Sequence, residues 1–181
     1  MINATILKAI REAIKQGDLQ EVIRLIGDDK ERLSMMTAFG TWIHVAADYG
    51  KIDICQWLVA NGINLNAYGG IAGGGALQGA ASEGHLDVVR YLLECGADLD
   101  ISEPERNPLF GAIHGRHPEI AKMLIDHGID TQVRYPRGEG KTRNALEFAR
   151  EWGCEEIVAL LEHPSRGEPM KNSGGRAGKL A

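Results

Sequence analysis

The stretch that decides the fold is Ala80–Asp98, with the sequence AASEGHLDVVRYLLECGAD. It predicts two short helices that meet in a tight turn at Gly84–His85. The second helix carries an apolar stripe at helical spacing, formed by Val88, Val89, Leu92 and Leu93. Gly96 follows, where glycine ends a helix in the left-handed conformation without a Cβ penalty. A helix pair this short cannot bury its own apolar face, so it needs copies on either side.

The copies are present in the sequence. An alanine recurs at one position of the first helix with steps of 34, 32 and 37 residues, as Ala46, Ala80, Ala112 and Ala149. The closing glycine recurs with steps of 34 and 32 residues, as Gly62, Gly96 and Gly128. A period of about 33 residues is typical of a helix–turn–helix unit preceded by a turn. The chain therefore predicts an array of stacked helix pairs.

These units resemble the ankyrin repeat family. The stretch Thr41–Ala47 (TWIHVAA), followed by Gly50, is similar to the family pattern T-P-L-H-x-A-A…G-H…G-A-D, which Gly84–His85 and Gly96–Asp98 match most closely. Two later units replace T-P-L-H with Asn107–Phe110 (NPLF) and Asn144–Glu147 (NALE). The resemblance covers roughly residues 5 to 163. It implies an all-α ankyrin-repeat solenoid of five units, whose first and last repeats serve as caps.

The sequence divides into a repeat domain over residues 1–163 and a tail over residues 164–181. The helices expected in the first two units are Thr5–Lys15, Leu19–Ile26, Thr41–Tyr49 and Ile52–Asn61. The charged run Asp28–Arg32 between these units is expected to be a solvated loop. The tail has the composition of a flexible linker, and its end, Gly178–Ala181, resembles part of a cloning scar.

Composition limits the function. The chain has 20 basic and 25 acidic residues, a formal net charge of −5. Nucleic-acid binding rests on a cationic face, so no nucleic-acid partner is expected. No apolar stretch approaches the ~20 residues that cross a bilayer, and the N-terminus lacks a signal-peptide pattern. We expect a cytoplasmic protein without a membrane partner, monomeric on its own.

Two glycine-rich segments invite a phosphate-binding interpretation. Tyr68–Gly75 contains no Gly-Lys-Ser/Thr, and no strand is predicted before it. Gly138–Thr142 imitates the end of a phosphate-binding loop, but Tyr135 occupies the position of that loop's first glycine. Both segments fall where the repeat pattern places a finger turn. We interpret the first as a flexible finger and the second as a longer finger that either contacts an acidic partner or is an inert insertion.

Metal and catalytic sites are not predicted. His114 and His117 suggest metal ligation, but zinc needs three or four convergent ligands, and His117 aligns with the turn residue His85. The three cysteines, Cys55, Cys95 and Cys154, are expected to be free cytosolic thiols. No serine has the strand-to-helix context that makes it reactive. We therefore expect no metal, no cofactor and no enzymatic activity.

The resemblance to ankyrin arrays implies a concave groove, lined by the finger turns and the outward edge of the first helix of each pair. By register, the expected partner-binding residues are Phe39, Trp42, Asp48, Tyr49, Tyr68, Ser82, Glu83, Glu103, Arg106, His114, Tyr135, Arg137, Lys141, Arg143, Glu151 and Trp152. Aromatic residues flanked by charge are typical of interface anchors. Tyr49 and Trp152 are the strongest candidates, whereas Trp42 also fits a packing role between units.

The sequence thus favours a non-catalytic module that binds a protein partner. The sharper hypothesis is an immunity protein that neutralises a bacterial toxin, since small ankyrin proteins resemble such inhibitors. An acidic inhibitor suits a basic toxin, because complementary charge raises the association rate. A regulatory ankyrin adaptor or an effector protein is the alternative within the binding class. A thiol-dependent role in oxidative stress is the alternative from another class.

Overall fold

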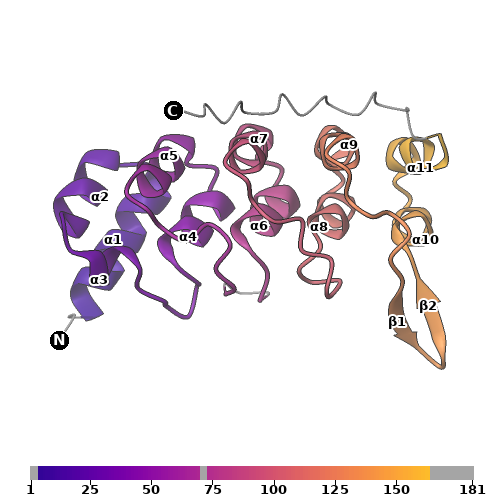
Figure 1. Ribbon diagram of the computed structural model, residues 1–181, viewed down its shortest axis with the longest axis horizontal. Helices are drawn as coiled ribbons and strands as arrows, with labels where there is room; N and C mark the ends of the chain where they lie inside the picture. The colour runs from indigo at the N-terminus through magenta and orange to yellow at the C-terminus, as the bar shows by residue number, and fades with distance from the viewer. Residues whose placement is uncertain (1–3, 70–72, 164–181) are drawn as a thin grey trace, which may run out of the picture.

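The computed structural model describes residues 4–69 and 73–163. Five helix pairs stack in chain order, with one helix of each pair in an inner layer and the other in an outer layer (Figure 1). The inner helices are α1 (Ala4–Gln16), α4 (Trp42–Asp48), α6 (Ala76–Glu83), α8 (Pro108–Gly115) and α10 (Ala145–Glu151). The outer helices are α2 (Leu19–Ile26), α5 (Ile52–Ala60), α7 (Leu86–Glu94), α9 (Pro118–Asp126) and α11 (Glu155–Glu162). The predicted all-α solenoid of five units is confirmed.

The core runs between the two layers along the whole stack. In the central unit, Val88, Val89 and Leu92 are fully buried, as the apolar stripe predicted. Neighbouring inner helices are in contact, and Gly111 lets α8 approach α6, since a Cβ there would meet the Gln78 carbonyl oxygen at 3.1 Å. Gly96 follows α7 at φ +82°, which confirms the predicted left-handed helix end.

Side chains in the turns between paired helices link successive repeats. The Nε2 atom of His85 lies 3.0 Å from the carbonyl oxygen of Asp48, and Nε2 of His117 lies 3.2 Å from that of Ser82. A carbonyl only accepts, so each imidazole donates from Nε2. In the last unit, the Cys154 thiol donates to the Ile113 carbonyl at 3.4 Å. The predicted equivalence of His117 and His85 as turn residues is confirmed, and both side chains satisfy a carbonyl group of the preceding repeat.

The prediction that Asp28–Arg32 forms a solvated loop is wrong in part. A short helix, α3 (Lys30–Leu33), forms there because the Asp29 side chain accepts a hydrogen bond from the Arg32 backbone N–H at 3.0 Å. Leu33 is buried at the end of this helix. The Arg32 carbonyl accepts a 2.6 Å hydrogen bond from the indole nitrogen of Trp42, so α3 is part of the packed structure.

The longest finger is an antiparallel hairpin of β1 (Tyr135–Gly138) and β2 (Lys141–Arg143) that projects from the stack before α10 (Figure 1). Its tip turns at Glu139, which has φ +49°. In the finger predicted over Tyr68–Gly75, residues 70–72 lie outside the described residues, as does the predicted tail over 164–181.

Candidate partner-binding groove

The inner helices and the fingers enclose a row of cavities, which we call the inner groove. The central cavity, about 360 Å³, lies between α4 and α6. A second cavity, about 410 Å³, lies beside α8 and α10, and Gln78 and Ser82 line both. A smaller one, about 120 Å³, lies between α1 and α4 and shares Asp48 and Tyr49 with the central cavity. Each of the three cavities therefore shares lining residues with the next along the stack.

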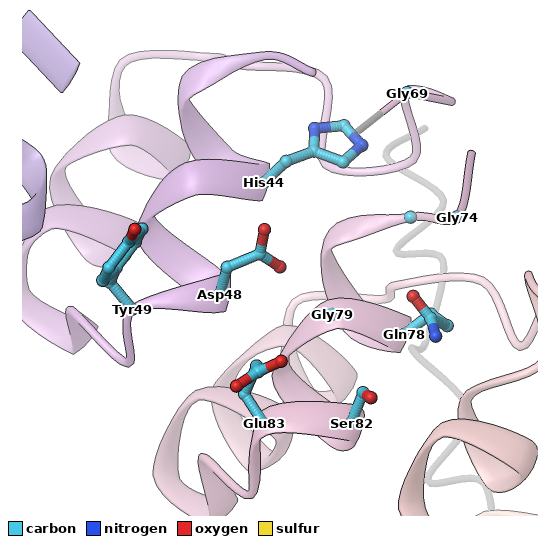
Figure 2. A pocket seen from close by; sticks show the side chains of 10 residues that line it. His44, Asp48, Tyr49, Gly69, Gly74, Gln78, Gly79, Ser82 and Glu83 are labelled. Atoms are coloured by element: carbon cyan, nitrogen blue, oxygen red, sulfur yellow. The ribbon is translucent and has the colours of Figure 1, made fainter. Parts of the chain in front are cut away.

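The central cavity is acidic. The carboxylates of Asp48 on α4 and Glu83 on α6 point into the space between the two helices (Figure 2). The pKa of Asp48 is raised to about 6, chiefly by burial and also by the charge of Glu83, while His85 opposes the rise. The described residues include no ion pair to either carboxylate.

The buried imidazole of His44 closes the finger end of this cavity (Figure 2). Its Nδ1 atom accepts a hydrogen bond from the Thr41 N–H at 3.2 Å, which assigns the remaining proton to Nε2. Burial lowers the pKa of His44, against the opposing effect of the nearby carbonyls of Ala67 and Gly74. Nε2 nevertheless makes no hydrogen bond of acceptable geometry with any residue that the structure describes.

The second cavity is aromatic. Phe110 and Phe148 stack with ring centroids 4.7 Å apart, and Arg143 lies 4.4 Å from the Phe148 ring centroid. His114 and Trp152 pack against each other with centroids 4.7 Å apart. Trp152 keeps 37% of its surface exposed. This combination of exposed indole and buried phenyl rings provides an apolar contact surface of the kind that interface anchors use.

Exposed aromatic residues at the other positions lie next to cations. The Tyr49 ring, 45% exposed, has the Lys15 ammonium 5.4 Å from its centroid. Phe39 is paired with the guanidinium of Arg11 and Tyr68 with that of Arg106, at 4.3 and 4.8 Å. These pairs hold the rings in place at the groove edge.

The structure places the predicted site residues in different surroundings. The central cavity brings together Asp48, Tyr49, Ser82 and Glu83, and the second brings together His114, Arg143 and Trp152. Glu151 on α10 pairs with the hairpin residues Arg137 at 2.5 Å and Arg143 at 3.2 Å, and within the hairpin Lys141 pairs with Glu139 at 3.5 Å. These finger cations are therefore partly neutralised. Glu103 is exposed in its turn.

Two of the predicted contact residues are corrected by the structure. Trp42 is 1% exposed, because its ring packs in the core and its indole N–H bonds to the Arg32 carbonyl. Tyr135 is 4% exposed, with its hydroxyl donating to the Ile101 carbonyl at 2.7 Å and accepting from Asn107 Nδ2 at 3.0 Å. Neither presents a surface to a partner.

Sequence reasoning missed several groove residues, chiefly Gln78, Gly79, Phe110 and Phe148. Gly79 carried a usable signal, because a glycine inside a helix costs about 1 kcal/mol and so marks a special position. A Cβ at residue 79 would collide with the Asp48 carboxylate. Nothing comparable marked Phe110 and Phe148, since an apolar residue on an inner helix predicts only core packing.

The cysteines do not gather into a reactive site. All three are free, and Cys55 and Cys154 are buried. Burial raises the pKa of the Cys55 thiol to about 12, and such a thiol carries almost no reactive thiolate at neutral pH. Over residues 4–69 and 73–163, no group of His, Cys, Asp and Glu side chains has the arrangement to hold a metal ion. The described helices include none long and apolar enough to span a membrane.

Comparison with known proteins gives one consistent picture. A family model described as "Ankyrin repeats (3 copies)" matches residues 10–103 and 80–171. An ankyrin repeat protein of Rickettsia felis is 30% identical over 102 residues, which cover 52% of this chain and 45% of the relative. One from fowlpox virus is 29% identical over 146 residues, covering 77% and 33%. The chain thus spans less than half the length of these two relatives. Human protein phosphatase 1 regulatory subunit 27 is 33% identical over 112 residues, covering 61% and 72%.

Proposed function

This chain belongs to the ankyrin repeat family, whose repeats form protein-interaction modules, and on that premise we propose that its inner groove binds one basic protein domain. The observation that carries the proposal is the pairing of an acidic cavity with an aromatic one along a single groove. Asp48 and Glu83 supply unpaired negative charge, and Trp152 supplies an exposed anchor beside it. A net charge of −5 extends the same complementarity over longer range.

The biological role that we propose is that of an immunity protein, which neutralises a cognate bacterial toxin by occupying its active site or substrate path. A basic, nuclease-like toxin is the partner that best matches the acidic groove, because the face of a nuclease that binds its substrate must be cationic. In this proposal the chain has no catalytic activity and acts as a monomer in the cytoplasm. Residues 1–163 carry the binding function, and residues 164–181 are dispensable for it.

One comparison favours a second candidate. The chain is similar to a protein that is named as a regulatory subunit of a phosphatase, which favours a role as a regulatory adaptor. Such an adaptor would bind an enzyme through the same groove. The two candidates differ in the consequence of binding. An immunity protein abolishes the toxicity of its partner, whereas an adaptor redirects or tunes the activity of an enzyme.

The test begins by searching the adjacent genes for a toxin domain, which is then coexpressed with the chain and titrated in a calorimeter. Tyr49→Ala and Trp152→Ala should each weaken binding about 30-fold or more, which corresponds to about 2 kcal/mol. Arg90→Ala on the outer helix α7 is the matched control, because Arg90 is exposed on the opposite layer. If both groove variants bind with wild-type affinity, the groove is not the binding site. Loss of binding in the Arg90 variant alone would place the interface on the outer layer.

A further inference from the structure

The central cavity combines three features that folding does not need. Asp48 and Glu83 face each other, and neither forms an ion pair with a described residue. Gly79 lies inside α6, where alanine would favour the helix by about 1 kcal/mol, and its missing side chain leaves room for the Asp48 carboxylate. The buried Nε2–H of His44 makes no hydrogen bond of acceptable geometry with a described residue, although the carbonyls of Ala67 and Gly74 lie nearby. Departures of this kind from the rules of a stable fold concentrate at binding sites.

We propose that this cavity receives one arginine side chain of the protein partner, with the guanidinium held between the carboxylates of Asp48 and Glu83. The inference rests on the proposed function and names the group that the groove recognises. A guanidinium has five N–H donors in a planar fork, and the cavity offers acceptors on two sides, from α4 and from α6.

The chemistry of the cavity favours arginine over other occupants. An anion would meet two carboxylates, and a neutral side chain would leave the partly buried Asp48 carboxylate unpaired. The Tyr49 ring at the cavity edge offers a face for a planar cation. At the finger end, the Nε2–H of His44 is a donor suited to a backbone carbonyl of the same segment. A partner segment can therefore fill both ends of the cavity, with its arginine side chain at the carboxylates and a backbone carbonyl at His44.

The binding should depend on pH through Asp48. Its pKa is raised to about 6, so the carboxylate is charged at pH 7.5 and about nine-tenths protonated at pH 5. The groups that face it are Glu83 from α6, His85 from the turn before α7, and His44 on its own helix, with Lys15 of α1 beside the neighbouring Tyr49. Arginine affinity should fall about tenfold from pH 7.5 to pH 5.

The test begins with a small probe, Nα-acetyl-arginine methylamide, titrated by NMR into the full chain. The citrulline analogue is the control, because it has the shape of arginine without its charge. Asp48→Asn should weaken arginine binding about tenfold or more and remove its pH dependence. Glu83→Gln should weaken binding about threefold to tenfold. Glu94→Gln, a matched change at an exposed position of the outer helix α7, should leave it unchanged.

The outcomes separate this inference from the proposed function. If the protein partner binds wild type and Asp48→Asn equally well, the arginine cavity is wrong and the proposed function stands. If no basic domain binds but the arginine probe does so in an Asp48-dependent way, the cavity stands and the proposed function fails. Binding of the citrulline analogue, or of the corresponding lysine derivative, as tightly as the arginine probe would overturn the assignment of arginine.

Discussion

Replacing Asp48 with asparagine should make the protein more stable at neutral pH. The substitution removes the charge and keeps the size, so the contact with Gly79 is retained. Folding raises the pKa of Asp48 from its ordinary value of 3.8 to about 6, chiefly because burial penalises the carboxylate. The unfolded chain therefore holds the negative charge more readily than the folded chain does. Above pH 6, this difference opposes folding.

The magnitude follows from the same two pKa values. Each tenfold change in an acid dissociation constant corresponds to about 1.4 kcal/mol. A rise from 3.8 to about 6 therefore gives about 3 kcal/mol as an upper bound. Because the carboxylate is only partly buried, solvent screening reduces this to about 1–2 kcal/mol. Asp48→Asn should recover that amount in the free energy of unfolding.

The sign of the pH dependence is fixed by linkage. Below pH 3.8 the carboxyl is protonated in both states, and the penalty is absent. It grows as the pH rises from 3.8 to about 6 and stays constant above that. Asp48→Asn should therefore gain its full 1–2 kcal/mol at pH 7.5 and about a third of this gain at pH 4.5.

Urea unfolding followed by circular dichroism at the two pH values measures the gain directly. Asp28→Asn is the matched control, because Asp28 is exposed and the change in charge is the same. Its stability should stay within about 0.5 kcal/mol of wild type at both pH values. An Asp48→Asn protein less stable than wild type at pH 7.5, or a gain that does not change with pH, would refute the reasoning. The first result would show that the carboxylate stabilises the fold.

Three other changes test the fold. Leu92→Ala should cost about 2–5 kcal/mol in urea unfolding, because the side chain is fully buried in the central repeat, and a cost below about 1 kcal/mol would contradict the packing described. Gly96→Ala should cost about 1–2 kcal/mol in the same assay because of its φ of +82°, and a cost below about 0.3 kcal/mol would contradict the left-handed helix end. His117→Ala should lower the free energy of unfolding by about 1 kcal/mol, because its hydrogen bond to the Ser82 carbonyl is lost. His114→Ala, at an exposed position, should change the stability little. Equal losses in the two variants would contradict the role of His117 in linking repeats.

The sequence was sufficient for the repeat, because each repeat specifies its own structure through local signals. The apolar stripe of residues 86–94, the left-handed glycine at 96 and the turn at 84–85 act within one unit, and stacking follows from the face that one unit leaves uncovered. The period also placed His85 and His117 in equivalent turns, so their shared role could be predicted. The short helix α3 was missed, since its cap, Asp29, lies in a charged run that looks like a solvated loop.

The character of the groove was decided by the tertiary structure. Register put Trp42, Asp48 and Tyr49 into one predicted surface, yet packing buried Trp42 in the core, left Tyr49 at the groove edge and confined Asp48 opposite Glu83. The pKa of a carboxylate depends on charges and solvent within a few ångströms, and for Asp48 these come from a helix more than 30 residues further along the chain. Sequence period fixes which positions face the groove, but the distance between side chains of neighbouring repeats is set only when the helices pack. For that reason the repeat could be derived from the residues alone, and the acidic cavity could not.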